Sequence, residues 1–471
     1  MQYYLQKNNL QKEFYSLFFD MKFKIDFSTY KNILKLALPA IAGLSTQMVV
    51  SLVDTAMIGR LDNATYALAA MGLGVLATWA IVSFFSSLAT GTHVLIAHNN
   101  GSKDFLRCGK VLDSSIVFGF IIGIIVSLVF VFFSSTIANF FAADFTVGNL
   151  AADYLFYRFL GIPFFLITVS FRGFYFGIGN TKVFMISGIL INLFNIIFNY
   201  IFIYGEFGIE PMGLAGAGLG STLATICDAV FYFVVAISSG YRHKYNLFRS
   251  IVPDLKILKK ILSISLPVSF QNVFILIGFL SFVAITGLIG TAEQAASQLV
   301  ISSLFVSIMP CFGFGIAAQT LVATAIGDDN IKLAKNLGNE TSKLATIYTI
   351  FVGLIFTIIP DQFLLIITTD RDLIQVAIPA LKIAGFGQIF YAIGVVLSNG
   401  LQAKGNSLFV MAAEVIMNCL IFVPAGYFFG VFMGYGLKGA WATLPVYIII
   451  YSSAIFIKFN YGDWSKAKNI S

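Results

Sequence analysis

Long apolar runs separated by short polar breaks repeat along the whole chain. Most runs are rich in Ile, Leu, Phe, Gly and Ala. An α-helix needs about 20 apolar residues to cross a bilayer, whereas the strands of a membrane barrel alternate over about 10. The run lengths favour helices and predict twelve membrane spans, at 31–59, 65–98, 107–136, 150–178, 183–205, 213–240, 257–289, 293–325, 331–359, 373–402, 407–430 and 436–459.

Charged residues are too scarce for a soluble protein of this length. Of the 471 residues, 58% are hydrophobic and 11% are charged, whereas about 25% of an ordinary soluble domain is charged. Lipid, unlike water, can solvate helices that are apolar all round. The expected fold class is therefore an all-α integral membrane protein with twelve transmembrane helices, located in the inner (plasma) membrane.

Lys and Arg are distributed unevenly among the loops. The chain contains 29 of them, and its formal net charge is +7. Only Arg60, Arg371 and Lys438 fall in one set of alternate loops, and most of the others lie near the N-terminus, in the other loops or in the tail. Because cytoplasmic loops are enriched in Lys and Arg, both termini are expected in the cytoplasm. The same rule explains the positive charge without a nucleic-acid partner.

The two halves of the chain resemble each other. ILKLALP at 33–39 returns as ILSISLP at 261–267, and GNTKVFMISGILIN at 179–192 returns as GNSLFVMAAEVIMN at 405–418. Each half has six spans, so both halves enter the membrane from the same side. We expect two pseudo-symmetric six-helix lobes with substrate handled between them, a common plan of secondary transporters. A duplicated channel would share this repeat.

The repeat and the basic loops together predict the domain organisation. The segment YRHKYNLFRSIVPDLKILKK at 241–260 separates the halves and reads as a linker. Met21 is an alternative start of the chain. The expected parts are a cytoplasmic lead-in at 1–30, an N-lobe at 31–240, a cytoplasmic linker at 241–256, a C-lobe at 257–460 and a cytoplasmic tail at 461–471.

A carboxylate interrupts the apolar stretch MVVSLVDTAMIGR at 48–60, at Asp54. A charge at the bilayer centre costs roughly 2.5–3.5 kcal/mol on insertion scales, so such residues are usually buried and often functional. Gln47 and Ser51 precede Asp54 at helical spacing, which predicts a narrow polar face. We expect both to line a substrate cavity.

Three amides share one face of the fifth span, at Asn192, Asn195 and Asn199. Because amides facing lipid would be costly, we expect this face to meet Asp54 inside the N-lobe. Low-dielectric surroundings disfavour the charged form of a carboxyl group, so Asp54 could bind and release a proton. Carboxylate and amide oxygens could instead hold a hard cation such as Na⁺, and a purely structural Asp54 is a further alternative.

Two further positions bear on how this cluster works. Phe282 is the repeat counterpart of Asp54, so the duplicated scaffold does not itself require a polar cluster. Pro39 lies on the N-terminal side of Asp54 in the same span, and proline removes a helical hydrogen bond and permits a kink. The first span could therefore bend at Pro39 when Asp54 changes protonation. Alternatively, Pro39 only begins the helix.

Other polar residues inside the spans carry weaker signals. Gln271 and Asn272 could line the second lobe, while Asp228 and Glu414 are intramembrane acids without an assigned role. The four Cys and three His show no spacing typical of a metal site or a disulfide framework, and no P-loop is present. We therefore expect no enzyme activity, no ATP drive and no cofactor beyond a coupling ion.

Several motifs resemble those of the MATE (multidrug and toxic compound extrusion) family. The motif of the first span is most similar to that of the DinF-like branch. The resemblance to the family covers residues 31–459. The motifs are LALP at 36–39, VDTAMIGRL at 53–61, LAAMGLG at 68–74, RFLGIPF at 158–164, GFYFGIGNTK at 173–182 and NLFNIIFN at 192–199.

The resemblance implies cation-coupled export of varied, often cationic amphipathic compounds by alternating access, through a monomer. Asp54 matches the coupling residue of the family and Asn195 an amide of the same cluster. Ser221 or Thr222 matches a nearby hydroxyl. Many relatives have an acid where this chain has Asn199.

A second departure concerns the other lobe. One branch of the family has carboxylates in the seventh and tenth spans, where this chain has Ile275 and Tyr391. With one carboxylate left in the cluster, proton coupling fits better than Na⁺ coupling, but both stay open.

Three other activities compete with cation-coupled export. A flippase for a lipid-linked precursor would need several cationic side chains in a central cavity to hold phosphate, yet only Arg158, Arg172 and Lys382 lie within the spans. A membrane-embedded enzyme would need converging catalytic groups, which the sequence does not show. A channel would conduct without any coupling gradient.

Overall fold

The computed structural model describes residues 27–142, 144–249, 252–465 and 467. The expected lead-in up to residue 26, including Met21, and residues 468–471 of the tail lie outside the described residues. The first half contains α2 (Phe27–Ile58), α3 (Ala64–Ser86), α4 (Leu88–Gly101), α5 (Phe105–Phe132), α6 (Ser134–Phe141), α7 (Phe145–Leu160), α8 (Ile162–Gly177), α9 (Thr181–Tyr204), α10 (Leu214–Ser238) and α11 (Tyr241–Tyr245).

The second half has the same overall course with two π-helical interruptions. It contains α12 (Leu255–Ile289), α13 (Thr291–Gly327), α14 (Ile331–Ile358), α15 (Pro360–Leu364), α16 (Arg371–Ala403), α17 (Ser407–Val415), η1 (Ile416–Phe422), α18 (Val423–Tyr427), η2 (Phe428–Phe432) and α19 (Gly436–Tyr461).

The prediction of twelve spans is confirmed. Eleven helical segments of the described chain are long and apolar enough to cross a membrane. The twelfth is the pair α7 and α8, which bends by 49° at its break. Gly161 stands at this break and Pro163 lies in the first turn of α8. The sequence pattern had shown this pair as one uninterrupted run.

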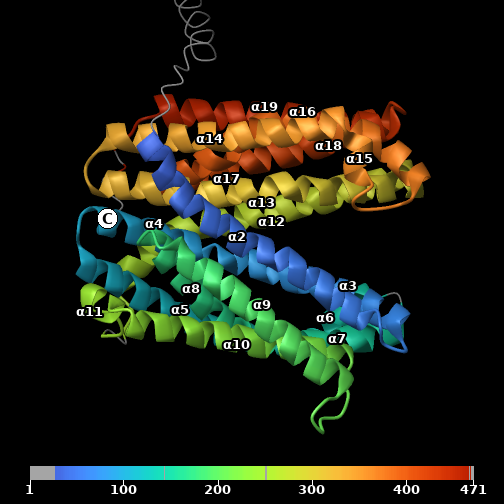
Figure 1. The fold of residues 1–471 in the computed structure, drawn as a ribbon, viewed down its shortest axis with the longest axis horizontal. Helices are drawn as coiled ribbons and strands as arrows, with labels where there is room; N and C mark the ends of the chain where they lie inside the picture. Colours follow the sequence, from blue (N-terminus) through green and yellow to red (C-terminus); the bar gives the residue numbers. More distant parts are fainter. Residues whose placement is uncertain (1–26, 143, 250–251, 466, 468–471) are drawn as a thin grey trace, which may run out of the picture.

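The helices form two layers that correspond to the two halves of the sequence (Figure 1). Helices α12–α19 make up one layer, the C-lobe, and α3–α10 make up the other, the N-lobe. The loops rich in Lys and Arg lie at one end of the helices, which we call the basic end. The opposite end, with Glu206 and Glu210 after α9, is the acidic end.

Helix α2 runs from one lobe to the other. Its first half, around Ile33 and Ala37, is buried in a cluster with Cys311, Phe314 and other residues of the C-lobe. Its second half packs against α9 of the N-lobe. Pro39 lies inside the continuous helix rather than at its beginning, so the alternative that this proline only begins the span is wrong.

The lobes are sealed against each other in the half of the molecule near the basic end. His93 Nε2 lies 2.8 Å from Thr320 Oγ1, and His98 Nε2 lies 2.8 Å from the carbonyl oxygen of Ala403. Nearby, the Cα of Gly101 lies close against the backbone of Thr324. Within the described chain, no hydrogen bond joins the lobes in the half near the acidic end.

Gly327 offers a direct test of this seal. A Cβ atom added at this position would overlap the carbonyl oxygen of His98 in the other lobe. We expect Gly327→Val to cost about 1–3 kcal/mol in the sealed state and to loosen it. A cysteine introduced at Ala97, which is fully buried in the seal, reports this change in a chain whose native cysteines are replaced. Its reaction with a water-soluble maleimide in detergent should become several-fold faster.

The matched control for this experiment is Gly72→Val, because an added Cβ at Gly72 has no neighbour within 4 Å. Equal labelling rates in the Gly327 variant and in the control would mean that close backbone approach does not hold the seal.

Candidate functional site

Helix α2 brings Asp54 against the N-lobe helix α9. The half-buried carboxylate accepts a hydrogen bond of 2.8 Å from Asn199 Nδ2. Small residues allow the two helices to approach: a Cβ added at Gly188 would lie 2.9 Å from Thr46 Oγ1. Gly43 supports the same approach, because its Cβ would lie 2.7 Å from the ring of Phe184. Close packing of the backbones therefore positions the short Asp54 side chain within reach of an amide.

The hydrogen bonds continue from Asp54 into the N-lobe. Asn199 Nδ2 also donates to Asn195 Oδ1 over 3.2 Å, and Asn195 Nδ2 donates to Ser221 Oγ on α10 over 2.9 Å. Asn195 and Asn199 are one helical turn apart and both are buried. The structure thus brings together Asp54, two of the three predicted amides and one of the two candidate hydroxyls.

The orientation of Asn199 is set by α10. A Cβ on Gly220 would collide with the Asn199 side chain, so the glycine leaves room for the amide. Asn199 Oδ1 is buried there and accepts no hydrogen bond from the described residues. The amide therefore presents its N–H groups, rather than its oxygen, to the carboxylate.

A cation that sequence reasoning did not assign to the site lies close to it. The positive charge of Arg158 on α7 acts on Asp54, and both groups act on the buried Tyr154. Arg158 forms no ion pair within 4.0 Å in the described part of the chain, and its Nε is buried without a hydrogen-bond partner. Its place in the RFLGIPF motif was the available signal, but the depth of the residue was not visible in the sequence.

Four other predicted residues lie outside this hydrogen-bond network. Gln47 and Ser51 are exposed on α2, and Asn192 is half-buried without a hydrogen bond from its amide to the described protein. Thr222 instead donates to the carbonyl oxygen of Tyr157 over 2.7 Å. The cavity-lining roles of Gln47, Ser51 and Thr222 and the coupling role of Asn192 stay predictions.

The two candidates from the second lobe make hydrogen bonds away from Asp54, one within the C-lobe and one across to the N-lobe. Gln271 Oε1 accepts from Gln402 Nε2 over 3.3 Å. Asn272 Nδ2 donates over 2.9 Å to the carbonyl oxygen of Ser83 in the N-lobe. They are therefore separate from the Asp54 cluster.

The C-lobe has aromatic packing at the position equivalent to Asp54. Phe282 is buried and its ring lies 4.8 Å from that of Phe422 and 5.2 Å from that of Trp441, measured between centroids. Among the described residues, the carboxylate and amides at this level thus belong to the N-lobe, whereas the buried Glu414 of the C-lobe pairs with Tyr447.

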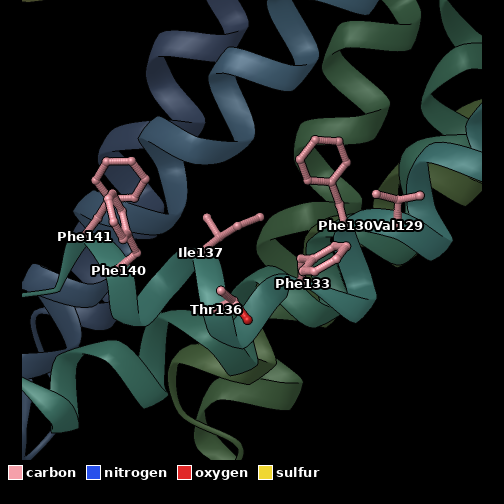
Figure 2. A pocket seen from close by; sticks show the side chains of 7 residues that line it. All are labelled: Val129, Phe130, Phe133, Thr136, Ile137, Phe140 and Phe141. Atoms are coloured by element: carbon pink, nitrogen blue, oxygen red, sulfur yellow. The ribbon is translucent and has the colours of Figure 1, made fainter.

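A surface hollow at the junction of α5 and α6 is of a different kind (Figure 2). It has a volume of about 400 Å³ and an apolar lining that includes the rings of Phe130, Phe133, Phe140 and Phe141. Such a lining exposes no titratable group and no oxygen ligand for a coupling ion, so we place the candidate functional site at Asp54.

Comparison with known families decides what kind of protein carries this arrangement. The model of the MatE family matches residues 39–201 and 267–461. The chain belongs to the MatE family. The two matches begin at Pro39 and Pro267, the prolines of LALP and ISLP, which confirms the duplication. This MATE protein is therefore a multi-pass membrane transporter, as the motifs had predicted.

Curated relatives cover nearly the whole chain. A probable multidrug resistance protein NorM from Thermotoga maritima is 27% identical over 437 residues, which is 93% of each chain. A protein of the same name from Pasteurella multocida is 25% identical and covers 93% of this chain and 96% of its own. The DinF-like branch stays a prediction.

Solved structures show the same fold. One, described as the outward-facing conformation of a multidrug resistance MATE family transporter, has a TM-score of 0.85 at 20% identity, covering 94% of this chain and 97% of that one. A transporter from Pyrococcus furiosus, described as having a binding pocket of reversed polarity, has a TM-score of 0.83 at 20% identity, covering 92% and 95%.

Two asparagines on the same face of α9 give a matched test of the site. Asn199→Ala removes the donor to Asp54 and leaves buried polar groups unpaired, which should cost about 1–3 kcal/mol of unfolding free energy. Asn192→Ala removes an amide without such bonds and should cost less than about 0.5 kcal/mol. Denaturant unfolding of both variants in the same detergent measures the difference. Similar losses in the two variants would contradict the assigned network.

Proposed function

We propose that this MATE protein is a proton-coupled antiporter of the plasma membrane that exports amphipathic, often cationic, compounds. The chain would lie with both termini and its basic end in the cytoplasm. Family membership and the names of the curated relatives support multidrug export. The half-buried Asp54, with the N–H donor of Asn199, is the observation that carries the proposal of proton coupling.

The polarity of the site favours a proton over Na⁺. A bound Na⁺ needs several oxygen ligands around it. Asn199 instead points an N–H donor at the carboxylate, and the charge of Arg158 acts on the same group. Both features oppose a metal cation, whereas a proton needs only one carboxylate oxygen.

The seal between the lobes supports alternating access. The basic end is closed by contacts such as His93–Thr320, and in the proposed cycle this is the state that opens outward. When Asp54 takes up a proton from outside, it loses its charge and its attraction to Arg158 and to the Asn199 donor. The outer half of α2 can then move against α9, while its inner half stays anchored in the C-lobe.

Pro39 lies between the anchored and the mobile part of α2. Because a proline leaves one helical hydrogen bond unmade, bending costs less there than elsewhere in the helix. In the proposed cycle, this bend and the lost carboxylate charge both weaken the hold on a cationic substrate, which leaves outward. When the seal then reopens toward the cytoplasm, Asp54 releases the proton to the inside.

Reconstituted transport tests the coupling. In liposomes, a proton gradient and a Na⁺ gradient are imposed separately, and movement of a fluorescent cationic dye is followed. The wild type should respond to the proton gradient, and Asp54→Asn should be slower by about tenfold or more, because the exchangeable proton site is gone. Thr55→Ala serves as the control, because Thr55 is exposed on the same helix and its hydroxyl bonds only to the carbonyl oxygen of Ser51 in that helix.

Each alternative result has a definite meaning. Dye movement driven by Na⁺ alone would identify a metal-ion antiporter. Undiminished proton-driven movement in Asp54→Asn would remove Asp54 from the mechanism. Absence of dye movement under either gradient would favour a lipid-linked substrate.

A further inference from the structure

A second polar cluster is buried in the N-lobe, nearer the basic end than Asp54. Asp228 on α10 is 1% exposed, and its Oδ1 accepts a hydrogen bond of 2.6 Å from Ser187 Oγ on α9. The charge of Arg172 on α8 acts on this carboxylate, although the two groups form no ion pair within 4.0 Å. We call this group, with Tyr175 and Tyr232, the inner cluster.

The inner cluster holds an unusual concentration of unsatisfied polar atoms. Four buried atoms have no hydrogen-bond partner among the described residues: Arg172 Nε, Tyr175 Oη, Asp228 Oδ2 and Tyr232 Oη. The rings of Tyr175 and Tyr232 are stacked with centroids 5.7 Å apart. Buried polar atoms nearly always bond to protein or to ordered water. The cluster therefore has the composition of a hydrated site.

The inner cluster and the Asp54 site occupy two levels of the same helix pair. On α9, Ser187 precedes Asn195 by eight residues, a rise of about 12 Å. On α10, Asp228 follows Ser221 by seven residues, about 10 Å. The buried Thr225 lies between these levels, and its hydroxyl donates a hydrogen bond to the carbonyl oxygen of Ser221. The α9–α10 interface thus carries polar groups from Asp54 to Asp228.

The inner cluster also connects toward the basic end. The ring of Tyr175 lies 5.7 Å from that of Tyr241 in α11, centroid to centroid. The Tyr241 hydroxyl accepts a hydrogen bond of 2.7 Å from Asn180 Nδ2, and both residues are half-buried. Polar groups therefore continue from Asp228 to the surface at that end.

We infer that Asp228 is a second proton-binding residue, which receives the proton from Asp54 and passes it to the cytoplasm. The inference rests on the proposed proton coupling and adds the inward half of the route. Its geometric basis is a buried carboxylate with an unpartnered Oδ2, close to an arginine whose buried Nε is also unpartnered, on the helix pair that holds the Asp54 network.

The ionisable groups around Asp228 fit this role. Cys227 and Tyr232 neighbour it on α10, and Arg172 and Tyr175 approach from α8. Helix α9 contributes the neutral Ser187, and α11 contributes Tyr241. Arg158 and Tyr154 of α7 act at the Asp54 level instead. Arg172 is thus the one cation that acts on Asp228 among the described residues, and it stabilises the ionised carboxylate between proton transfers.

The transfer balances without any further reactant. Protonated Asp54 gives its proton to a water molecule, which passes one of its own protons onward, and Asp54 becomes an anion again. The carboxylate of Asp228 takes up the proton and becomes neutral. It then releases the proton to water at the basic end and is again an anion beside Arg172. The asparagine amides position the waters and the carboxyl groups but do not carry the proton themselves.

The test separates net proton delivery from substrate binding. In proteoliposomes, Asp228→Asn should slow proton-gradient-driven dye movement by about tenfold or more. Exchange of dye for dye at equal pH moves no net proton and should stay within about twofold of the wild type. Asp228→Glu keeps a proton-binding group and should recover much of the driven rate.

Two further variants control for structural effects. Ser187→Ala keeps the carboxylate but removes its hydroxyl donor, and it provides a second measurement if Asp228→Asn does not fold. It should slow driven movement several-fold with exchange intact. Glu414→Gln removes a buried acid of the C-lobe that is paired with Tyr447, so it measures the general cost of losing a membrane carboxyl group.

The outcomes distinguish this inference from the proposed function. A wild type that ignores the proton gradient refutes proton coupling itself. A wild type that responds, with Asp228→Asn equally fast, refutes the role of Asp228 alone. Equal losses of driven movement and exchange, or the same loss in Glu414→Gln, would show a structural role and also overturn the inference.

Discussion

The hydrogen bond between Asp54 and Asn199 is the interaction on which the functional architecture depends. A carboxylate inside a membrane protein is tolerated only where nearby groups compensate its charge. Here an amide donor and the charge of Arg158 do so from two N-lobe helices, α9 and α7. Because each compensating group acts on the ionised form, protonation weakens both interactions at once. Binding of one proton at Asp54 therefore weakens the packing of α2 against the N-lobe.

That coupling reaches the other lobe because α2 is shared. Its first half is buried among C-lobe residues, around Ile33 and Ala37, and its second half carries Asp54. A change at Asp54 therefore acts between the lobes rather than within one. The seal near the basic end depends on close packing rather than on charge. The backbones of the two lobes are in direct contact at Gly101 and Gly327, so the lobes there are either in contact or apart. Such packing suits a switch between two states.

Much of the fold was visible in the sequence, whereas parts of the site were not. Hydropathy determined the spans, because lipid solvates apolar helices, and helical periodicity placed Asn195 and Asn199 on the face that meets Asp54. The bend at Gly161 escaped the pattern because the run of apolar residues continues across it without a polar break. Arg158 escaped assignment because a membrane sequence gives the depth of a residue only coarsely. Its approach to Asp54 depends on how α7 packs.

The two lobes divide the work because their interiors differ. At the level of Asp54 the C-lobe is filled by Phe282, Phe422 and Trp441, whose contacts do not change with protonation. The N-lobe keeps a polar helix interface in the corresponding place, at the expense of buried atoms without protein partners. The C-lobe can therefore anchor α2 through apolar contacts, while the N-lobe presents the carboxylate that responds to a proton. The two halves have therefore diverged since the duplication. The N-lobe holds the carboxylate that binds the proton, and the C-lobe holds the anchored half of α2.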